Sequence, residues 1–205
     1  MSAEATPLNV ASLSVEERQS SSISAIISSI ERAVEDFYYD EEYAHPLKNH
    51  VVGLDEDRTV IFVKADIDSG CLKNGKDPEK ISHTLAVQYG VPADSVYQLI
   101  GKKIGGHGKP SNVFPVNPNV LHDWKSDEDV VYSHVQKVNC YASLTFAFKY
   151  GDENEPLRPS DIYYRIQLFE NGKSIDNAIE RHIKNTLVPP KTFHLTFADY
   201  SKNNV

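Results

Sequence analysis

The chain has 205 residues, of which 40% are hydrophobic and 10% aromatic; this is enough for the core of one globular domain and excludes a short disordered adaptor. Its two cysteines, Cys71 and Cys140, are too few for a disulfide framework and lack the spacing of a structural zinc site. Residues 1–60 hold 12 Asp and Glu against 4 Lys and Arg, so they carry the whole net charge of −8. The neutral remainder does not exclude nucleic acid as a partner.

No targeting or membrane segment is visible in the sequence. The first residues lack the basic start and apolar stretch of a signal peptide, and nowhere do 18 apolar residues run together. We therefore expect no membrane association and a cytoplasmic location, although a dedicated secretion system could recognise a signal that these criteria miss.

The first predicted element is an amphipathic helix from about residue 15 to about residue 39. Ser14 and Glu17 have the spacing of a capping box. The serines at 20–22 lower the helix propensity, so docking of the apolar face must stabilise the helix, either on this chain or on a partner protein. Its acidic face is either solvated or a docking surface. The apolar residues at helical spacing are Ile23, Ile26, Ile27, Ile30, Val34 and Phe37.

After Pro46 the pattern becomes mixed. It predicts a strand at Thr59–Val63, a helix that starts at Asp77-Pro78-Glu79 and ends at Gly90, a helix over Asp127–Val138, and strands at Ser143–Tyr150 and Ile162–Phe169, the last followed by a hairpin turn at Asn171-Gly172. The predicted fold class is α+β, with an antiparallel sheet and helices. Residues 1–50 are expected to form an acidic helical segment, and residues 51–205 one domain.

A glycine-rich basic segment precedes the second of these helices. Such a loop can bring its backbone close to phosphate while lysines supply charge, or its glycines can simply serve turns. It fits neither a Walker loop nor a dinucleotide fingerprint. Its glycines and basic residues are Gly101, Lys102, Lys103, Gly105, Gly106, His107, Gly108 and Lys109.

The order of residues around this loop resembles the DNA/RNA non-specific endonuclease superfamily, in particular its bacterial toxin branch. The resemblance covers roughly residues 59–185 and implies a ββα-metal nuclease core. It rests on Leu99-Ile100-Gly101, Ile104-Gly105-Gly106, Gly108, Asn112-Val113-Phe114-Pro115, Trp124 and Glu128, and less specifically on Tyr150, Arg158-Pro159 and Asn171-Gly172.

The resemblance implies a site in which a histidine deprotonates water and an asparagine holds Mg²⁺. In this chain Gln98 stands at the histidine position, and a carboxamide cannot act as a general base. Val120 stands at the asparagine position, and valine offers no lone pair to a metal. The glycine before the histidine is Tyr97, the aspartate position falls on Ser95 with Asp94 one place off, and the glutamine after the proline is Val116.

Other residues could replace the missing ones. His107 could serve as a relocated base, or it could be an exposed loop residue. Asn112, Asn119 and Glu128 are candidate metal-binding residues, and His122 and Asp123 also lie close to Val120 in sequence. Trp124 is expected to anchor the core at the start of a helix.

The sequence therefore predicts a catalytically degenerate nuclease-fold protein without a cofactor. It would bind nucleic acid weakly through Lys102, Lys103 and Lys109, or a protein through the N-terminal helix. The alternative is an active Mg²⁺-dependent non-specific endonuclease with His107 as base. A structural α+β domain whose similarity is fortuitous is the third possibility.

Overall fold

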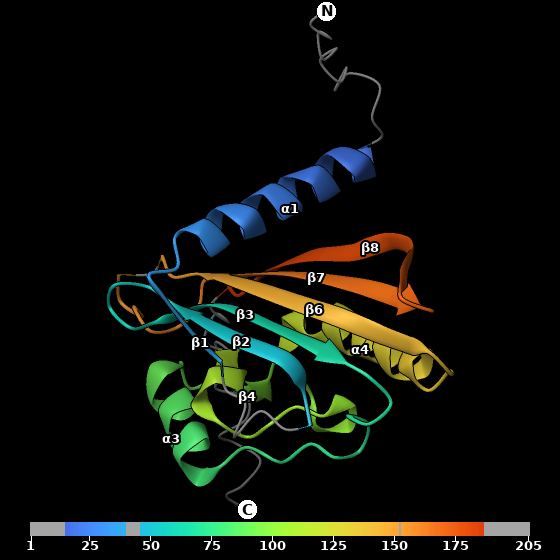
Figure 1. The fold of residues 1–205 in the computed structure, drawn as a ribbon. Coiled ribbons are helices and arrows are strands. Elements are labelled where there is room, and N and C mark those ends of the chain that lie inside the picture. Colours follow the sequence, from blue (N-terminus) through green and yellow to red (C-terminus); the bar gives the residue numbers. More distant parts are fainter. Residues whose placement is uncertain (1–14, 40–45, 152, 187–205) are drawn as a thin grey trace, which may run out of the picture.

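The computed structural model describes residues 15–39, 46–151 and 153–186. Six antiparallel strands form the main sheet, in the spatial order β1-β2-β3-β6-β7-β8 (Figure 1). Their bounds are β1 (Asp36–Tyr39), β2 (Lys48–Leu54), β3 (Val60–Ile67), β6 (Cys140–Lys149), β7 (Asp161–Glu170) and β8 (Lys173–Lys184). With the helices described next, this architecture confirms the α+β class.

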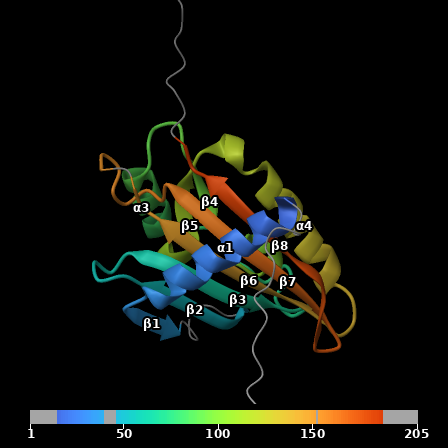
Figure 2. The same ribbon diagram turned by 90° about the horizontal axis from the view of Figure 1, so that it is seen from above.

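The sheet lies between two unequal layers. Helix α1 (Val15–Arg32) covers one face, and in Figure 2 it crosses β6 and β7. The opposite layer holds α3 (Lys80–Tyr89), α4 (His122–Val135) and a two-stranded hairpin of β4 (Ser95–Gln98) and β5 (Val113–Val116) (Figure 1). The main core fills the space between the sheet and this second layer. None of the helices in the described ranges is long and apolar enough to cross a membrane.

The N-terminal helix is shorter than predicted, because the stretch from residue 36 to residue 39 is a strand instead of the end of the helix. Aromatic residues favour strands, and β1 pairs in register with the edge of β2, with Phe37 opposite Gly53. The Phe37 ring also packs edge-on against Phe62, with the ring centroids 6.1 Å apart. Ser14 of the predicted capping box lies outside the described residues. The domain boundary expected between residues 50 and 51 falls inside β2.

The apolar face of α1 docks on the protein's own sheet. Ile23 and Ile27 are each 5% exposed, and they pack in a small cluster with Phe62, Ala147 and Tyr163. Burial of an isoleucine side chain contributes about 1.5–3 kcal/mol, so this contact supplies the stabilisation that the serine-rich helix lacks. The structure thus agrees with the intramolecular alternative.

Several local signals after the N-terminal helix are confirmed. Gly90 ends α3, and the β7–β8 hairpin turns at Asn171 and Gly172, whose φ angles are 50° and 76°. Helix α4 starts earlier than predicted, at His122, because Trp124 in its first turn packs edge-on against Phe146 and Tyr164, with ring centroids 5.1 and 4.8 Å apart. The helix ends before Val138, which is 84% exposed.

Candidate functional site

The segment that carries the family resemblance forms a hairpin followed by a helix. Strands β4 and β5 pair antiparallel, and Gln98 at the end of β4 lies opposite Val113. The glycine-rich loop joins the two strands through the short 3-10 turns η2 (Lys102–Ile104) and η3 (Pro110–Asn112). After β5 the turn η4 (Pro118–Val120) leads into α4. This is the order of elements that the resemblance implies.

The side chain at the position of the family base holds the backbone in place. The amide nitrogen of Gln98 donates to the carbonyl of Lys76 at 2.8 Å and to the carbonyl of His107 at 3.1 Å. Both N–H bonds of the carboxamide are therefore used to connect the glycine-rich loop to residues 73–79, which we call the strap.

The strap lies along the glycine-rich loop. The backbone nitrogen of Lys76 donates to the carbonyl of Gly106 at 2.9 Å, and that of Glu79 donates to the carbonyl of Gly108 at 2.8 Å. A Cβ atom on Gly106 would lie 1.5 Å from the carbonyl oxygen of Ile100, and one on Gly108 would lie 2.0 Å from that of Asp77. These glycines are thus required for close packing of the chain on itself.

Two residues that match the family pattern support the loop from beneath. Asn112 is fully buried; its Oδ1 accepts from the backbone nitrogen of Ile100 at 2.8 Å, and its Nδ2 donates to the carbonyls of Ile100 and His107 at 2.9 and 2.8 Å. Glu128 Oε1 accepts from the backbone nitrogen of Gly101 at 2.8 Å. Burial raises the pKa of Glu128. Both side chains therefore fix the backbone at the start of the loop.

The described residues do not fit the Mg²⁺ site that the resemblance implies. Val120 packs against the main core, and the oxygen of Asn112 already accepts a backbone N–H. Asn119 is exposed on η4 and shares no hydrogen bond with Asn112 or Glu128. Residues 15–39, 46–151 and 153–186 contain no group of three or more His, Cys, Asp and Glu side chains that could hold a metal ion.

His107 lies in the interior, so its interpretation as an exposed loop residue is wrong. It is 2% exposed, and its Nε2 faces the Nε2 of His50 at 3.4 Å. The backbone nitrogen of Lys109 donates to His107 Nδ1 at 3.2 Å, which leaves the proton of the neutral ring on Nε2. Burial, with added repulsion from His50 and Lys109, lowers the pKa of His107 to about 3. Burial likewise lowers the pKa of His50 to about 4.

The lysines expected to contact phosphate are each paired with a carboxylate. Lys102 Nζ lies 2.6 Å from Asp77, and Lys109 Nζ lies 3.0 Å from Glu79. Lys103 forms an ion pair with Asp129, and its ammonium also lies over the ring of Tyr132. The strap supplies two of the three acids, so the same segment covers the loop and offsets its positive charge.

A buried ion pair ties the hairpin to the end of β8, and sequence reasoning did not find it. Arg158 binds Asp94 with two nearly parallel bonds of 2.6 and 2.7 Å, and both side chains are 4% exposed. Asn185 joins this pair, because its carbonyl accepts from Arg158 at 2.6 Å and its side chain accepts from the backbone nitrogen of Asn117 at 2.9 Å. Arg158 belongs to the family pattern and Asp94 lies one place from its aspartate position, but no local signal indicates that residues so far apart in the chain meet.

Comparison with known proteins gives a match in sequence and matches in fold, while no family model matches the chain. The chain is 28% identical to "Probable deoxyribonuclease RhsA" of Dickeya dadantii (strain 3937) over 117 residues, which is 57% of this chain and 8% of that protein. The chain therefore spans only a small part of its curated relative.

Solved structures of nucleases match most of the chain at low sequence identity. NucA from Streptococcus agalactiae with no metal bound has a TM-score of 0.48 and 13% identity, and the match covers 85% of this chain and 90% of that one. NucA with a magnesium ion bound has a TM-score of 0.46 and 14% identity, with 76% and 79% covered. An extracellular nuclease has a TM-score of 0.44 and 11% identity, with 73% and 92% covered. The sequence match to a probable deoxyribonuclease confirms the resemblance to nucleases that the segment from Leu99 to Glu128 first indicated.

Proposed function

We propose that this chain is a nuclease-fold protein that does not hydrolyse phosphodiesters and that acts by binding. The observation that supports this function most directly is the hydrogen bonding of the Gln98 side chain. Its carboxamide stands where the family places a general base, and both of its N–H bonds go to backbone carbonyls. A carboxamide accepts no proton at neutral pH, and loss of a general base typically costs about 10²–10⁴-fold in rate.

The alternative base is poorly placed for catalysis. A general base must come within hydrogen-bond distance of the attacking water. The His107 ring is buried against His50, and its Nδ1 accepts a backbone N–H. Its lowered pKa also makes it a weak base. These features support an inactive site over one with a relocated base.

The ligand class that we propose is nucleic acid, bound weakly. The relative that matches in sequence is named a probable deoxyribonuclease, and the body of this chain carries no net negative charge against phosphate. Lys102, Lys103 and Lys109 would have to leave their carboxylate partners to contact a phosphate. A protein that bound the apolar face of α1 would first have to displace that helix from the sheet, so the structure supports nucleic acid over this second partner class.

A binding titration with fluorescein-labelled DNA and RNA tests both parts of this function. With Mg²⁺ present, the labelled strands should remain intact on a denaturing gel while the anisotropy rises only at high protein concentration. With three lysines in contact with phosphate, a plot of the logarithm of the binding constant against the logarithm of the salt concentration should have a slope no steeper than about −3. Cleaved strands, or tight binding with a much steeper slope, would contradict the proposal. The variant Lys184→Ala is the control, since this lysine lies at the end of β8 and outside the glycine-rich loop.

A further inference from the structure

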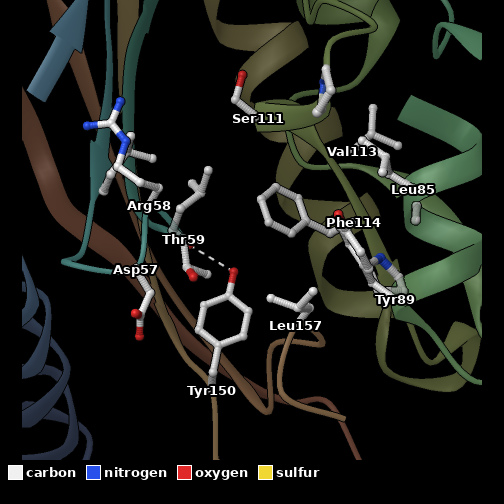
Figure 3. Close-up of a pocket in the computed structure, with 15 residues that line it drawn as sticks. Asp57, Arg58, Thr59, Leu85, Tyr89, Ser111, Val113, Phe114, Tyr150 and Leu157 are labelled. Atoms are coloured by element: carbon white, nitrogen blue, oxygen red, sulfur yellow. Dashed lines mark hydrogen bonds between the residues drawn. The ribbon is translucent and has the colours of Figure 1, made fainter. Parts of the chain in front are cut away.

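A cavity of about 560 Å³ opens between the β2–β3 turn, α3, β5 and the loop after β6 (Figure 3). Its volume is within the range of ligand-binding pockets. Neither Gln98 nor His107 lines it, although η3 and β5 of the hairpin form one of its walls. Leu157, at 44% exposure, lies on its rim. The side chains that form its walls include Leu85, Tyr89, Phe114, Tyr150 and Leu157.

Two of the polar side chains that line the cavity have partners within the chain. The Tyr150 hydroxyl donates to the carbonyl of Val60 at 2.8 Å, drawn as the dashed line in Figure 3. The guanidinium of Arg58 lies 2.5 Å from Asp36. The rest of the wall is mainly aromatic, aliphatic and proline surface, and its other polar side chains are Asp57, Thr59 and Ser111. Such a surface suits an apolar or proline-rich peptide and offers little to a phosphate.

The described part of the chain ends beside this cavity. Asn185 Nδ2 donates to the carbonyl of Pro115 at 3.2 Å, and Pro115 is part of the cavity wall. Arg158, which follows Leu157 of the rim, donates to the carbonyl of Asn185 at 2.6 Å. The carbonyl of Thr186 accepts from Asn117 at 3.0 Å. Residues 187–205 therefore start from a fixed point next to two of the cavity walls.

The sequence of residues 187–205 is rich in the apolar and proline residues that suit the surface of this cavity. It begins with an apolar stretch that contains Pro189-Pro190, and Phe193, Leu195 and Phe197 follow at every second position. Proline-rich segments bind aromatic-lined grooves with little loss of entropy, because they are already extended. A short tether also gives an effective concentration in the millimolar range. We propose that this cavity is the docking site of the chain's own segment 187–205.

Photo-cross-linking of the full chain tests this contact. Phe193 is replaced by p-benzoylphenylalanine, the protein is irradiated, and the linked peptides are identified by mass spectrometry. We expect cross-links within one chain, to residues 85–89 and 150–157. Cross-links to other surfaces, or between two chains as shown by a doubled mass on a denaturing gel, would overturn the assignment.

A rim variant makes the test specific. In Leu157→Asp a carboxylate would face the apolar segment, and we expect the cross-link yield to fall roughly tenfold, the ratio that about 1.4 kcal/mol produces. Val130→Asp on α4 is the matched control, since Val130 is 42% exposed and does not line the cavity; its yield should be unchanged. Equal yields in wild type and Leu157→Asp would contradict the proposal, and the wild-type cross-link map decides independently if Leu157→Asp is unfolded.

Discussion

The resemblance implies a reactive side chain at position 98 and another at position 120, where this chain has Gln98 and Val120, whereas Asn112 and Glu128 match the pattern. Asn112 still binds the backbone at Ile100, and Glu128 still binds Gly101. These two side chains have a structural role, because their polar atoms form hydrogen bonds with backbone groups of the loop. The bonds that Asn112 and Glu128 form with the loop backbone therefore do not depend on the residues at positions 98 and 120.

Replacement of Asn112 by alanine should destabilise the protein strongly. The change leaves the buried N–H and the buried carbonyl of Ile100 without the partner that Asn112 gives them, while the carbonyl of His107 keeps its bond from Gln98, and each unsatisfied group costs about 1–3 kcal/mol. We expect a loss of about 3 kcal/mol or more in the free energy of unfolding, measured by urea denaturation. Asn119→Ala, at an exposed position, should change it by less than about 0.5 kcal/mol. Equal effects of the two variants would refute the structural role of Asn112.

At the scale of elements, the sequence predicted what local signals specify. Gly90 and the Asn171-Gly172 turn mark their chain reversals directly, and the isoleucine spacing predicted α1. The position of the strap was not predictable, because it depends on contacts such as that of Lys76 with Gly106. The burial of His107 was missed for the same reason, since its partner His50 lies on a distant strand. The stretch from residue 36 to residue 39 became a strand through pairing with β2, a tertiary effect that outweighs helical spacing.

The docking of α1 can be tested by one charge on its buried face. In Ile27→Asp a carboxylate would face Phe62 and Tyr163, so the helix should leave the sheet and expose that apolar surface. We expect a lower melting temperature and aggregation, followed by circular dichroism and light scattering. Ser22→Asp places the same charge on an exposed position of the helix. This variant should have the wild-type melting temperature and should not aggregate. A soluble, monomeric Ile27→Asp with the wild-type melting temperature would count against the docking.

For the whole molecule, the buried pair of histidines predicts sensitivity to acid. Burial lowers the pKa of His50 to about 4 and that of His107 to about 3, whereas both rings have a pKa of about 6.5 in the unfolded chain. Below pH 6.5 the unfolded state binds more protons, so the stability present above that pH is lost as the pH falls toward 4 and 3. In this range each ring lowers the free energy of unfolding by up to about 1.4 kcal/mol for each pH unit of acidification.

Urea denaturation at pH 7, 6 and 5 measures this slope. His107→Gln should reduce the dependence on pH, because one of the two rings no longer titrates on unfolding. His122→Gln should leave the slope as in wild type, since the His122 side chain is 93% exposed. A wild-type stability that stays constant from pH 7 to pH 5 would show that the pair is not buried in the neutral form.

At the scale of the whole protein, we propose a nuclease fold without phosphodiester hydrolysis. The most direct measurement is digestion of plasmid DNA and of RNA by the purified chain with Mg²⁺ or Mn²⁺, with and without a chelator, beside His107→Ala. We predict no cleavage above background in any sample, because Gln98 and Val120 supply neither a base nor a metal ligand. Robust digestion that the chelator abolishes would contradict the account, and its loss in His107→Ala would identify His107 as the base.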